Sequence, residues 1–194
     1  EDGKELKLGG GFLDRLATID TSNVIPGLRD VHILVASDVT NPLCGEHGAS
    51  RVFGPQKGAT PEMVEILDNN LRHYAQVVKD QLGIDVLNVP GAGAAGGLGA
   101  GLLAFTNATM KKGIEIVIEY TNLKEKLRHA DYCFTGEGGI DFQTKFGKTP
   151  YGVAKVAKSV NPNMKVIALA GYIGKDVEVL YEEGFDAIFG IVPG

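Results

Sequence analysis

The last third of the chain alternates short apolar segments with helical patterns. Residues 130–136 (ADYCFTG), 165–173 (KVIALAGYI) and 187–192 (AIFGIV) are apolar runs of strand length, and a helical pattern separates each run from the next. Apolar strands that alternate with helices are typical of a parallel sheet covered on both faces. We therefore expect parallel strands over residues 130–192, with Val166–Leu169 central and buried on both faces.

A long amphipathic pattern occupies residues 60–83 (TPEMVEILDNNLRHYAQVVKDQLG), where apolar side chains recur at steps of three and four. This spacing places them on one stripe of a helix. The stripe consists of Met63, Leu67, Leu71, Tyr74, Val78 and Leu82. Thr60-Pro61, and again Thr149-Pro150, is a typical helix start with threonine as the capping residue. A further apolar run at 31–37 (VHILVAS) predicts a strand in the first part of the chain.

The composition excludes several classes of protein. Net charge is −5, and the basic residues form no block, so we expect no nucleic-acid partner. The apolar runs are too short to cross a bilayer, so we expect no membrane partner. Two cysteines without a CxxC spacing exclude a disulfide scaffold, and reduced thiols favour the cytoplasm.

The regular alternation begins near Ala130, which we take as the domain boundary. We expect an α/β protein of two lobes: residues 1–129 as a mixed α/β lobe with a Gly-rich loop, and residues 130–194 as the βαβαβ part of a Rossmann-like parallel lobe. The chain starts in a polar stretch without Met and stops after a strand-like run. We therefore expect both lobes to be incomplete and the chain to be a fragment.

Two loops in the first part carry candidate chemistry. SDVTNPLCGEHGAS follows the predicted strand at 31–37, and the carboxyl ends of strands in open α/β sheets are where ligands bind. Asp38 can accept a proton from a hydroxyl or hold Mg²⁺ through water, and Asn41 offers a donor and an acceptor. Asx turns before Pro42 are an equally good explanation. Lys57, just before the helix start at Thr60, can attract phosphate or be a solvated loop lysine.

The segment PGAGAAGGLGAG contains a literal GxGxxG at Gly91, Gly93 and Gly96. A dinucleotide site also needs a strand directly before the pattern and an acidic residue farther on, and Pro90 precedes the first glycine here. Backbone N–H groups of such a loop can still bind an anion. Close helix packing is the alternative, and it explains Gly97 and Gly101 better than Gly91 and Gly93.

The segment GEGGIDFQTKFGKT lies between a predicted strand and a predicted helix. It ends in GKT, as a P-loop does, but it lacks the first glycine of that motif. Carboxylates can hold Mg²⁺, and a lysine before a helix N-terminus can hold phosphate oxygens. The candidates are Glu137, Asp141, Gln143, Thr144 and Lys148. A linker is a poor alternative because two well-formed elements frame the segment.

Three motifs in the same order, SDVTNPLCGEHGASRVFGPQKGA, PGAGAAGGLGAG and TGEGGIDFQTKFGKTPYGVA, strongly resemble the bacterial glycerate kinase family that is unrelated to P-loop kinases. The resemblance covers nearly the whole chain, whereas the family's chain is about twice as long. It implies ATP- and Mg²⁺-dependent phosphorylation of D-glycerate in a cleft between two α/β lobes. It also implies that this fragment alone lacks turnover and self-associates as a homodimer through exposed apolar surface.

Residue roles follow from the resemblance as expectations. We expect Asp38, Glu137, Asp141 and Lys148 to be catalytic, with Glu137 or Asp141 on Mg²⁺ and Asp38 at the substrate hydroxyl. Residues expected to bind substrate or nucleotide are Asn41, Lys57, Gly91, Gly93, Gly96, Gly97, Gln143 and Thr144. Gly139 departs from the family, which has Arg at this position. Two alternatives remain: a dinucleotide-dependent oxidoreductase, resting on GAGAAG alone, and a non-catalytic anion-binding module.

Overall fold

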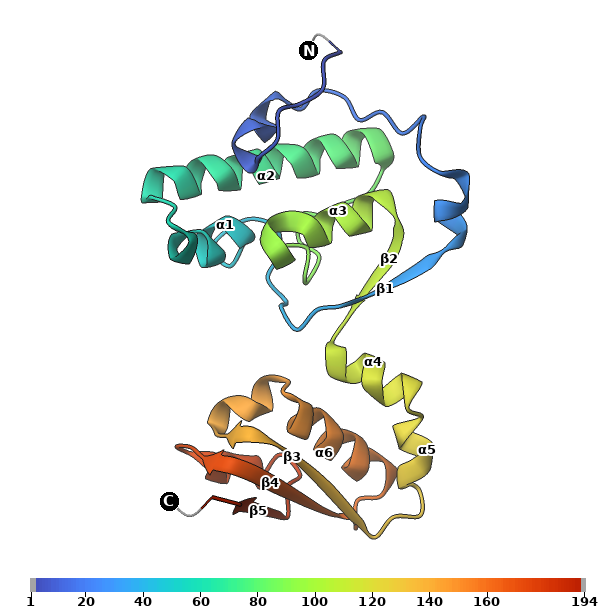
Figure 1. Cartoon of the computed structure of the whole chain (residues 1–194), viewed down its shortest axis with the longest axis vertical. Helices are drawn as coiled ribbons and strands as arrows, with labels where there is room; N and C mark the ends of the chain where they lie inside the picture. The colour runs from blue at the N-terminus through green and yellow to red at the C-terminus, as the bar shows by residue number, and fades with distance from the viewer. Residues whose placement is uncertain (1–2, 193–194) are drawn as a thin grey trace. The chain divides into compact units, whose positions relative to one another are not determined.

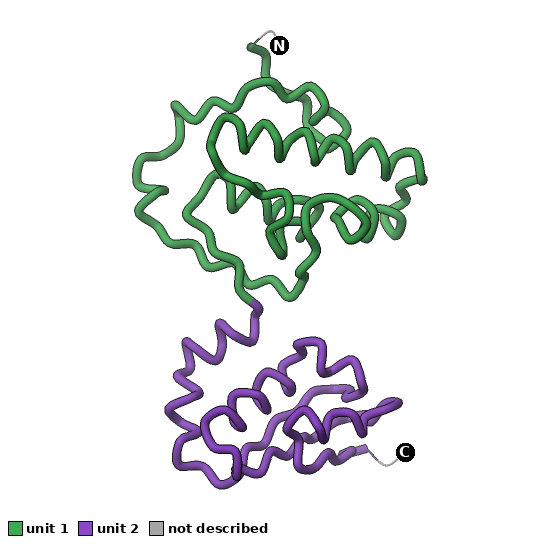
Figure 2. The backbone as a smooth tube through the Cα atoms, turned by 180° about the vertical axis from the view of Figure 1, so that it is seen from behind, with its two compact units in different colours: residues 1–111 green, residues 112–194 purple. Residues whose placement is uncertain are grey.

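The computed structural model describes residues 3–192 (Figure 1). The chain forms two compact units: unit 1, residues 1–111, and unit 2, residues 112–194 (Figure 2). The helices α4 (Gly113–Tyr120) and α5 (Leu123–Leu127) pack with unit 2. The division thus falls before the sequence-based boundary at Ala130, and the assignment of residues 1–129 and 130–194 as domains stays a prediction.

Unit 2 is built on a three-stranded parallel sheet of β3 (Tyr132–Ile140), β4 (Lys165–Ile173) and β5 (Ala187–Gly190). The strand order is β3-β4-β5, so β4 is central. The helix α6 (Thr149–Val160) connects β3 to β4 and packs on the sheet (Figure 1). The predicted parallel sheet and its central strand are therefore confirmed.

The two faces of this sheet differ in burial. On the face toward α6, the paired residues Cys133 and Val166 are buried, as are Ala168 and its β5 neighbour Ile188. The opposite face carries exposed apolar side chains: Tyr132 (61% exposed), Phe134 (63%), Leu169 (41%) and Phe189 (55%). Burial on both faces was therefore a wrong prediction, because within the described residues the apolar runs find a covering helix on one side only.

The two Thr-Pro helix starts turn out differently. In α2 (Pro61–Leu82), Thr60 is the cap, and its hydroxyl accepts the Met63 N–H at 3.3 Å, as predicted. In α6 the capping position is Lys148, and no side chain makes a capping hydrogen bond there. Thr149 is already the first helical residue. Pro150 therefore stands at the second helical position, since Lys148 rather than Thr149 has the extended backbone that precedes the helix.

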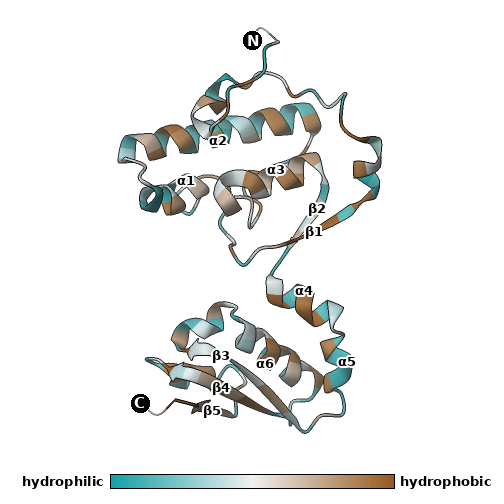
Figure 3. Ribbon diagram, in the orientation of Figure 1, coloured by the Kyte–Doolittle hydropathy of each residue, from teal (hydrophilic) through white to brown (hydrophobic). Residues whose placement is uncertain are grey.

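Unit 1 packs α1 (Ala49–Phe53), α2 and α3 (Leu98–Phe105) around one apolar core. In α2, Leu71 and Val78 are buried as predicted, but Met63 is 53% exposed. The buried face of α2 begins at Val64 and continues through Asp68 and Leu71, so Met63 lies beside this face. Figure 3 shows α3 without a strongly hydrophilic residue, and its Ala100 is fully buried in this core.

The remaining elements are short. Unit 1 also holds a pair of parallel strands, β1 (His32–Ala36) and β2 (Asn107–Lys111), which confirms the strand predicted at 31–37. Single 3₁₀ turns connect the main elements of both units. They are η1 (Gly10–Arg15), η2 (Pro26–Asp30), η3 (Pro55–Lys57), η4 (Ala94–Gly97), η5 (Phe142–Phe146) and η6 (Val177–Leu180).

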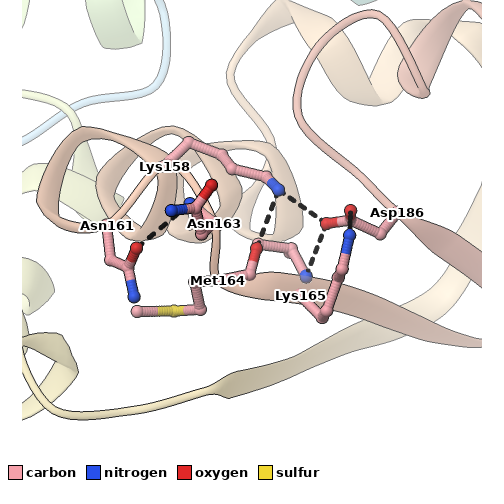
Figure 4. Close-up of polar contacts among 7 residues, drawn as sticks. Lys158, Asn161, Asn163, Met164, Lys165 and Asp186 are labelled. Carbon is pink, nitrogen blue, oxygen red and sulfur yellow. Dashed lines mark hydrogen bonds and ion pairs between the residues drawn. The ribbon is translucent and has the colours of Figure 1, made fainter.

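A polar joint fastens α6, β4 and the start of β5 to one another (Figure 4). The Lys158 amine donates to the Met164 carbonyl at 2.7 Å and to Oδ2 of Asp186 at 2.6 Å. The Val166 N–H donates to the same Asp186 oxygen at 2.9 Å, and Lys165 donates to Oδ1 at 3.1 Å. Asp186, just before β5, is therefore the common acceptor for three donors from α6 and β4.

These donors change the acidity of Asp186. Partial burial alone would raise the pKa of this carboxyl group, but the hydrogen bonds from Lys158, the Val166 N–H and Lys165 outweigh burial. Together they lower the pKa from an ordinary 3.8 to about 2. The carboxylate therefore stays ionised, and the joint intact, until the solution is strongly acidic.

Candidate active site

The structure brings four of the predicted residues of unit 2 together at the end of β3. The Lys148 amine lies 3.7 Å from Oε1 of Glu137 and 3.8 Å from Oδ1 of Asp141. The Thr144 hydroxyl is fully buried and donates to the same Glu137 oxygen at 3.4 Å. We call Glu137, Asp141, Thr144 and Lys148 the carboxylate–lysine cluster.

The local sequence explains how one short segment brings these groups together. Asp141 caps η5: its Oδ1 accepts the Gln143 N–H at 2.9 Å, and the Thr144 hydroxyl in turn accepts the Asp141 N–H at 3.3 Å. Gly147 then ends η5 in the left-handed conformation, with φ of 108°. This conformation favours glycine, and the turn brings Lys148 back beside Glu137 and Asp141. Of Gln143, only the backbone N–H takes part in these contacts.

β3 is longer than the sequence predicted. The ladder with β4 continues through Gly139–Tyr172 and Ile140–Ile173, so Glu137 lies within the strand and Asp141 directly follows it. The apolar run predicts a strand that ends at Gly136, and glycines usually weaken a strand, so the continuation through Gly138 and Gly139 is not visible in the pattern. Glu137 pairs with Ala170 and shares its face of the sheet, the face that α6 covers, which explains its contact with Lys148.

The carboxylate–lysine cluster is accessible to a ligand. The side chains of Glu137, Asp141 and Lys148 are 24%, 33% and 40% exposed. Mg²⁺ commonly uses one or two protein carboxylates and completes its shell with water and substrate phosphate, so Glu137 and Asp141 fit this ion. Residues 3–192 contain no group of three or more acidic, His or Cys side chains placed to hold a metal. A metal here would therefore depend on oxygens from the substrate or from water.

In unit 1, Asp38 follows the carboxyl end of β1, as predicted. The Asn41 side chain donates to the His47 carbonyl at 2.7 Å. The Asn41 backbone carbonyl accepts the N–H groups of Gly91 at 3.2 Å and Gly93 at 3.0 Å. Asn41 therefore ties the loop after β1 to the Gly-rich loop. Its predicted contact with a ligand remains a prediction, as does that of Lys57, which lies exposed on η3.

The Gly-rich loop has steric reasons for its glycines. A Cβ at Gly93 would lie 2.3 Å from the Pro42 carbonyl oxygen, and one at Gly91 would lie 2.8 Å from Met110. A Cβ at Gly101 would meet nothing, so the alternative of close helix packing does not explain this residue. Gly97 has a φ of 105°, and a Cβ there would lie close to the core side chains of Leu43 and Leu71. A Cβ at Gly96 would meet nothing, but its φ of 72° favours glycine at this position as well.

The Gly-rich loop also lacks the surroundings of a dinucleotide site. No strand lies between Gly83 and Pro90, the described residues before it, whereas the dinucleotide fingerprint follows a strand directly. Two of the three glycines that match the pattern, Gly91 and Gly93, donate their N–H groups to the Asn41 carbonyl and pack against the chain itself. The oxidoreductase hypothesis is therefore not supported.

Sequence reasoning missed Asp68, a carboxylate within α2 that is only 2% exposed. Its Oδ1 accepts the Gly45 N–H at 2.9 Å, and its Oδ2 accepts from Arg72 at 3.1 Å. The signal in the sequence was a carboxylate on the apolar side of α2, between the buried residues Val64 and Leu71. Burial and the nearby Asp68 charge also raise the pKa of the Cys44 thiol to about 11, so Cys44 is protonated near neutral pH.

Comparison with known proteins decides the family. The family model described as "Glycerate kinase family" matches residues 1–194. The chain belongs to the glycerate kinase family. It is 50% identical over 193 residues to a glycerate kinase of Halalkalibacterium halodurans, covering 100% of this chain and 50% of that protein. It is 52% identical over 191 residues to the glycerate 2-kinase of Escherichia coli strain K12, covering 98% of this chain and 50% of that protein.

The fold of this glycerate kinase family member has a solved counterpart. A crystal structure described as glycerate kinase 2 from Salmonella typhimurium LT2 superimposes with a TM-score of 0.81 at 49% identity, covering 97% of this chain and 48% of that one. The family resemblance and the α/β fold predicted from sequence are thus confirmed. The chain spans about half the length of these relatives. No helix within the described residues is long and apolar enough to cross a membrane.

Proposed function

We propose that this chain provides part of an ATP-dependent kinase that transfers a phosphoryl group to a hydroxyl of D-glycerate. The relatives that match over the whole chain at about 50% identity are named glycerate kinases. The observation that carries the proposal is the carboxylate–lysine cluster, where the Lys148 amine stands at the N-terminus of α6 and faces Glu137 and Asp141. Phosphoryl transfer requires mainly this kind of positioning and charge neutralisation.

Each residue of the cluster has a proposed role. Lys148 and the N-terminal N–H groups of α6 attract and orient the phosphate oxygens of ATP. Glu137 and Asp141 hold Mg²⁺, which when bound neutralises charge on the phosphates. Thr144 fixes Glu137 through its buried hydroxyl. The Gln143 side chain and the exposed backbone of Gly138–Gly139 complete the contacts with the phosphates.

In unit 1 we assign Asp38 to the substrate hydroxyl. Asp38 accepts the hydroxyl proton as the substrate oxygen bonds to the γ-phosphorus of ATP and the bond from that phosphorus to the leaving ADP oxygen breaks. We assign nucleotide or substrate contacts to Asn41, Lys57 and the Gly-rich loop at Gly91, Gly93, Gly96 and Gly97. The proposal also places the protein in the cytoplasm, where ATP and free Mg²⁺ are available.

ADP release with D-glycerate, ATP and Mg²⁺ tests this function, using the chain together with the sequence that flanks it in the native protein. Lys148→Ala should lower kcat by about 10²–10³-fold, the loss typical of one preorganised charged contact. Lys145→Ala is the matched control, because Lys145 lies in the same segment but contacts the Phe146 ring instead of the cluster. Near-normal turnover of Lys148→Ala, or an equal loss in Lys145→Ala, would remove Lys148 from the site.

The 194-residue chain alone should show negligible turnover. The chain corresponds to about half of its relatives' length, and positioning of reactants supplies about 7–11 kcal/mol of a barrier. Turnover of the chain alone at an ordinary enzymatic rate of about 1–10³ per second would show that the rest of such a protein is dispensable.

We also propose that the chain alone forms a homodimer through the exposed face of the unit 2 sheet. Tyr132, Phe134 and Phe189 are each more than half exposed there, beside Leu169. Since a whole aromatic side chain presents about 150–250 Å², these partly exposed side chains form an apolar patch of roughly 300–500 Å². A standard interface buries roughly 800 Å² per partner, so this patch would form the apolar centre of a larger contact. In a dimer with two-fold symmetry, the exposed sheet faces of the two copies would cover each other.

Analytical ultracentrifugation of the chain tests this dimer. Phe134→Ser should raise the dimer dissociation constant at least tenfold, whereas Tyr120→Ser, which changes an 80% exposed aromatic residue on α4, should leave it unchanged. A monomer at every concentration would contradict the proposal. A dimer that disappears when the native flanking sequence is present would show that this sequence covers the face instead.

A further inference from the structure

We propose that Asp68 is a positioning residue that fixes the two ligand-binding loops of unit 1 in one arrangement. This inference rests on the proposed function for the role of those loops. Asp68 is 2% exposed and lies on α2, so it acts from beneath the loops and touches no ligand. Its carboxylate, and the contacts that lead away from it, form a continuous path to Asn41 and to the Gly-rich loop.

The path begins at the turn after Leu43. Asp68 Oδ1 accepts the Gly45 N–H at 2.9 Å, and the Asp68 backbone carbonyl accepts from Cys44 Sγ at 3.5 Å. Gly45 has φ of 92°, a conformation that a residue with a side chain rarely adopts. The Gly45 carbonyl then accepts the Gly48 N–H at 2.9 Å and closes the turn. Glycine adopts this conformation without strain, and Asp68 holds the turn by the first N–H group of the turn.

The second step leads from the turn to both loops. The His47 carbonyl, inside the turn, accepts the Asn41 side-chain amide at 2.7 Å. The Asn41 carbonyl accepts the N–H groups of Gly91 and Gly93 at 3.2 and 3.0 Å. A turn released from Asp68 would move the His47 carbonyl, and Asn41 and the glycine N–H groups would follow. The loop after β1 and the Gly-rich loop would thus shift together.

The charge of Asp68 has its own partner. Arg72, one helical turn farther along α2, donates to Oδ2 at 3.1 Å, with its own side chain half exposed. A buried carboxylate needs such a donor because an unpaired buried charge is strongly unfavourable. The two oxygens therefore have different roles. Oδ2 forms the ion pair with Arg72 that compensates the buried charge, and Oδ1 accepts the Gly45 N–H that positions the loop.

Because the two carboxylate oxygens of Asp68 have different partners, we expect its variants to differ in how much catalytic activity they lose. Asp68→Asn keeps an oxygen for the Gly45 N–H, so kcat should fall less than threefold. Arg72→Ala leaves the Asp68–Gly45 hydrogen bond in place, so kcat should likewise stay within threefold, although the uncompensated buried charge should lower the free energy of unfolding. Asp68→Ala removes the Gly45 acceptor, and kcat/KM should fall about 10²-fold, the loss expected when a reacting group is displaced by about 1 Å. Asp80→Ala, which removes an exposed carboxylate of the same helix, is the control and should leave kcat/KM unchanged.

Amide hydrogen exchange by NMR provides a readout that does not depend on activity. In Asp68→Ala the Gly45, Gly91 and Gly93 amides should exchange at least tenfold faster, while the amide of Val78 in the core of α2 stays protected. The same amides should be unchanged in Asp68→Asn. All kinetic measurements use the chain together with its native flanking sequence. If this unmodified protein releases no ADP, the proposed function fails, but this exchange pattern would still support the positioning role.

Three results would overturn the inference. A match between Asp68→Asn and Asp68→Ala in every measurement would assign the effect to charge rather than to the Gly45 hydrogen bond. Equal acceleration of exchange at Val78 and at the loop amides would make Asp68 a residue of general stability. Failure of both Asp68→Ala and Asp68→Leu to fold would assign Asp68 to folding alone, because leucine refills the volume without an acceptor.

Discussion

The two glycine-rich segments of this chain resemble each other in composition and differ in what the glycines meet. In residues 90–101, added Cβ atoms at Gly93 and Gly99 would each lie 2.3 Å from a backbone oxygen. In residues 136–148, a Cβ at Gly136 would likewise lie 2.2 Å from the Leu169 carbonyl oxygen, but one at Gly138 would meet nothing, and one at Gly139 would meet only a Tyr172 ring carbon at 4.0 Å. Gly93 and Gly99 therefore allow the chain to pack on itself, whereas Gly138 and Gly139 leave backbone open to an incoming group.

The strongest test of this comparison is Gly93→Ala. The new methyl group would collide with the Pro42 carbonyl oxygen and push the two loops of unit 1 apart. We expect the free energy of unfolding to fall by roughly 2–3 kcal/mol, as in overpacked cores. Urea denaturation measures this change, with Gly101→Ala as the control. Because Gly101 lies in α3 with open space around it, its replacement should stabilise the protein by about 0.5–1 kcal/mol. Equal stability of the two variants would refute the steric explanation.

A second test asks what fixes the sheet on which the open segment lies. The pKa of Asp186, about 2 in the folded chain against 3.8 ordinarily, is lower in the folded state. Its contribution to stability is therefore complete above about pH 4 and is lost as the pH falls toward 2. With a discount for the 24% exposure of its side chain, we expect about 1–2 kcal/mol.

Denaturation curves at pH 7 and pH 2 measure this contribution. Asp186→Asn should destabilise unit 2 at pH 7, and the difference from the unmodified chain should largely vanish near pH 2. Asp176→Asn, at the capping position of η6, serves as the control carboxylate. A difference between Asp186→Asn and the unmodified chain that is the same at both pH values would show that charge is not what Asp186 contributes.

Gly138→Ala should have a smaller effect on stability and a larger one on activity. Alanine has less conformational entropy to lose than glycine, so we expect the free energy of unfolding to rise by about 0.5–1 kcal/mol. If the open backbone approaches the phosphates, the methyl group should nevertheless raise the KM for ATP. Thermal unfolding and ADP-release kinetics on the same variant separate these effects. A destabilised Gly138→Ala would mean that the second segment is packed like the first.

The smallest expected effect on stability is that of Gly139→Arg, which restores the residue that the family resemblance led us to expect. The space beside Gly139 is open, so the free energy of unfolding should change by no more than about 0.5 kcal/mol. A guanidinium there can bind a carboxylate or a phosphate through two hydrogen bonds. The KM for D-glycerate or for ATP should therefore fall, and unchanged values for both would show that an Arg at this position contacts neither.

Local patterns predicted the parts of the structure that depend on neighbouring residues. Three apolar runs separated by helical patterns were enough for the parallel sheet of unit 2. The contact of Glu137 and Lys148 was also within reach, because both residues lie in one short segment between a strand and a helix. The Thr60 cap follows from the same kind of local rule.

Contacts between distant segments were beyond such patterns. The packing of Gly93 depends on the Asn41–Pro42 backbone, far away in the chain, so composition alone suggested the wrong glycines for steric roles. The buried Asp68 stood in a polar-looking stretch of α2, and only the folded turn at Gly45 explains it. The exposed face of the unit 2 sheet was missed because an apolar run does not show whether a covering helix exists on each side.

Each unit contains one buried cysteine, whose rate of chemical labelling reports how often that unit opens. Cys44 lies in the core of unit 1 and Cys133 in the core of unit 2, and burial raises the pKa of both thiols. An alkylating reagent therefore reacts with either thiol only while the surrounding unit is open. The two labelling rates, separated by mass spectrometry of peptides, report how often each unit opens in an otherwise native population. No probe needs to be introduced for this measurement, because the chain carries one thiol in each unit.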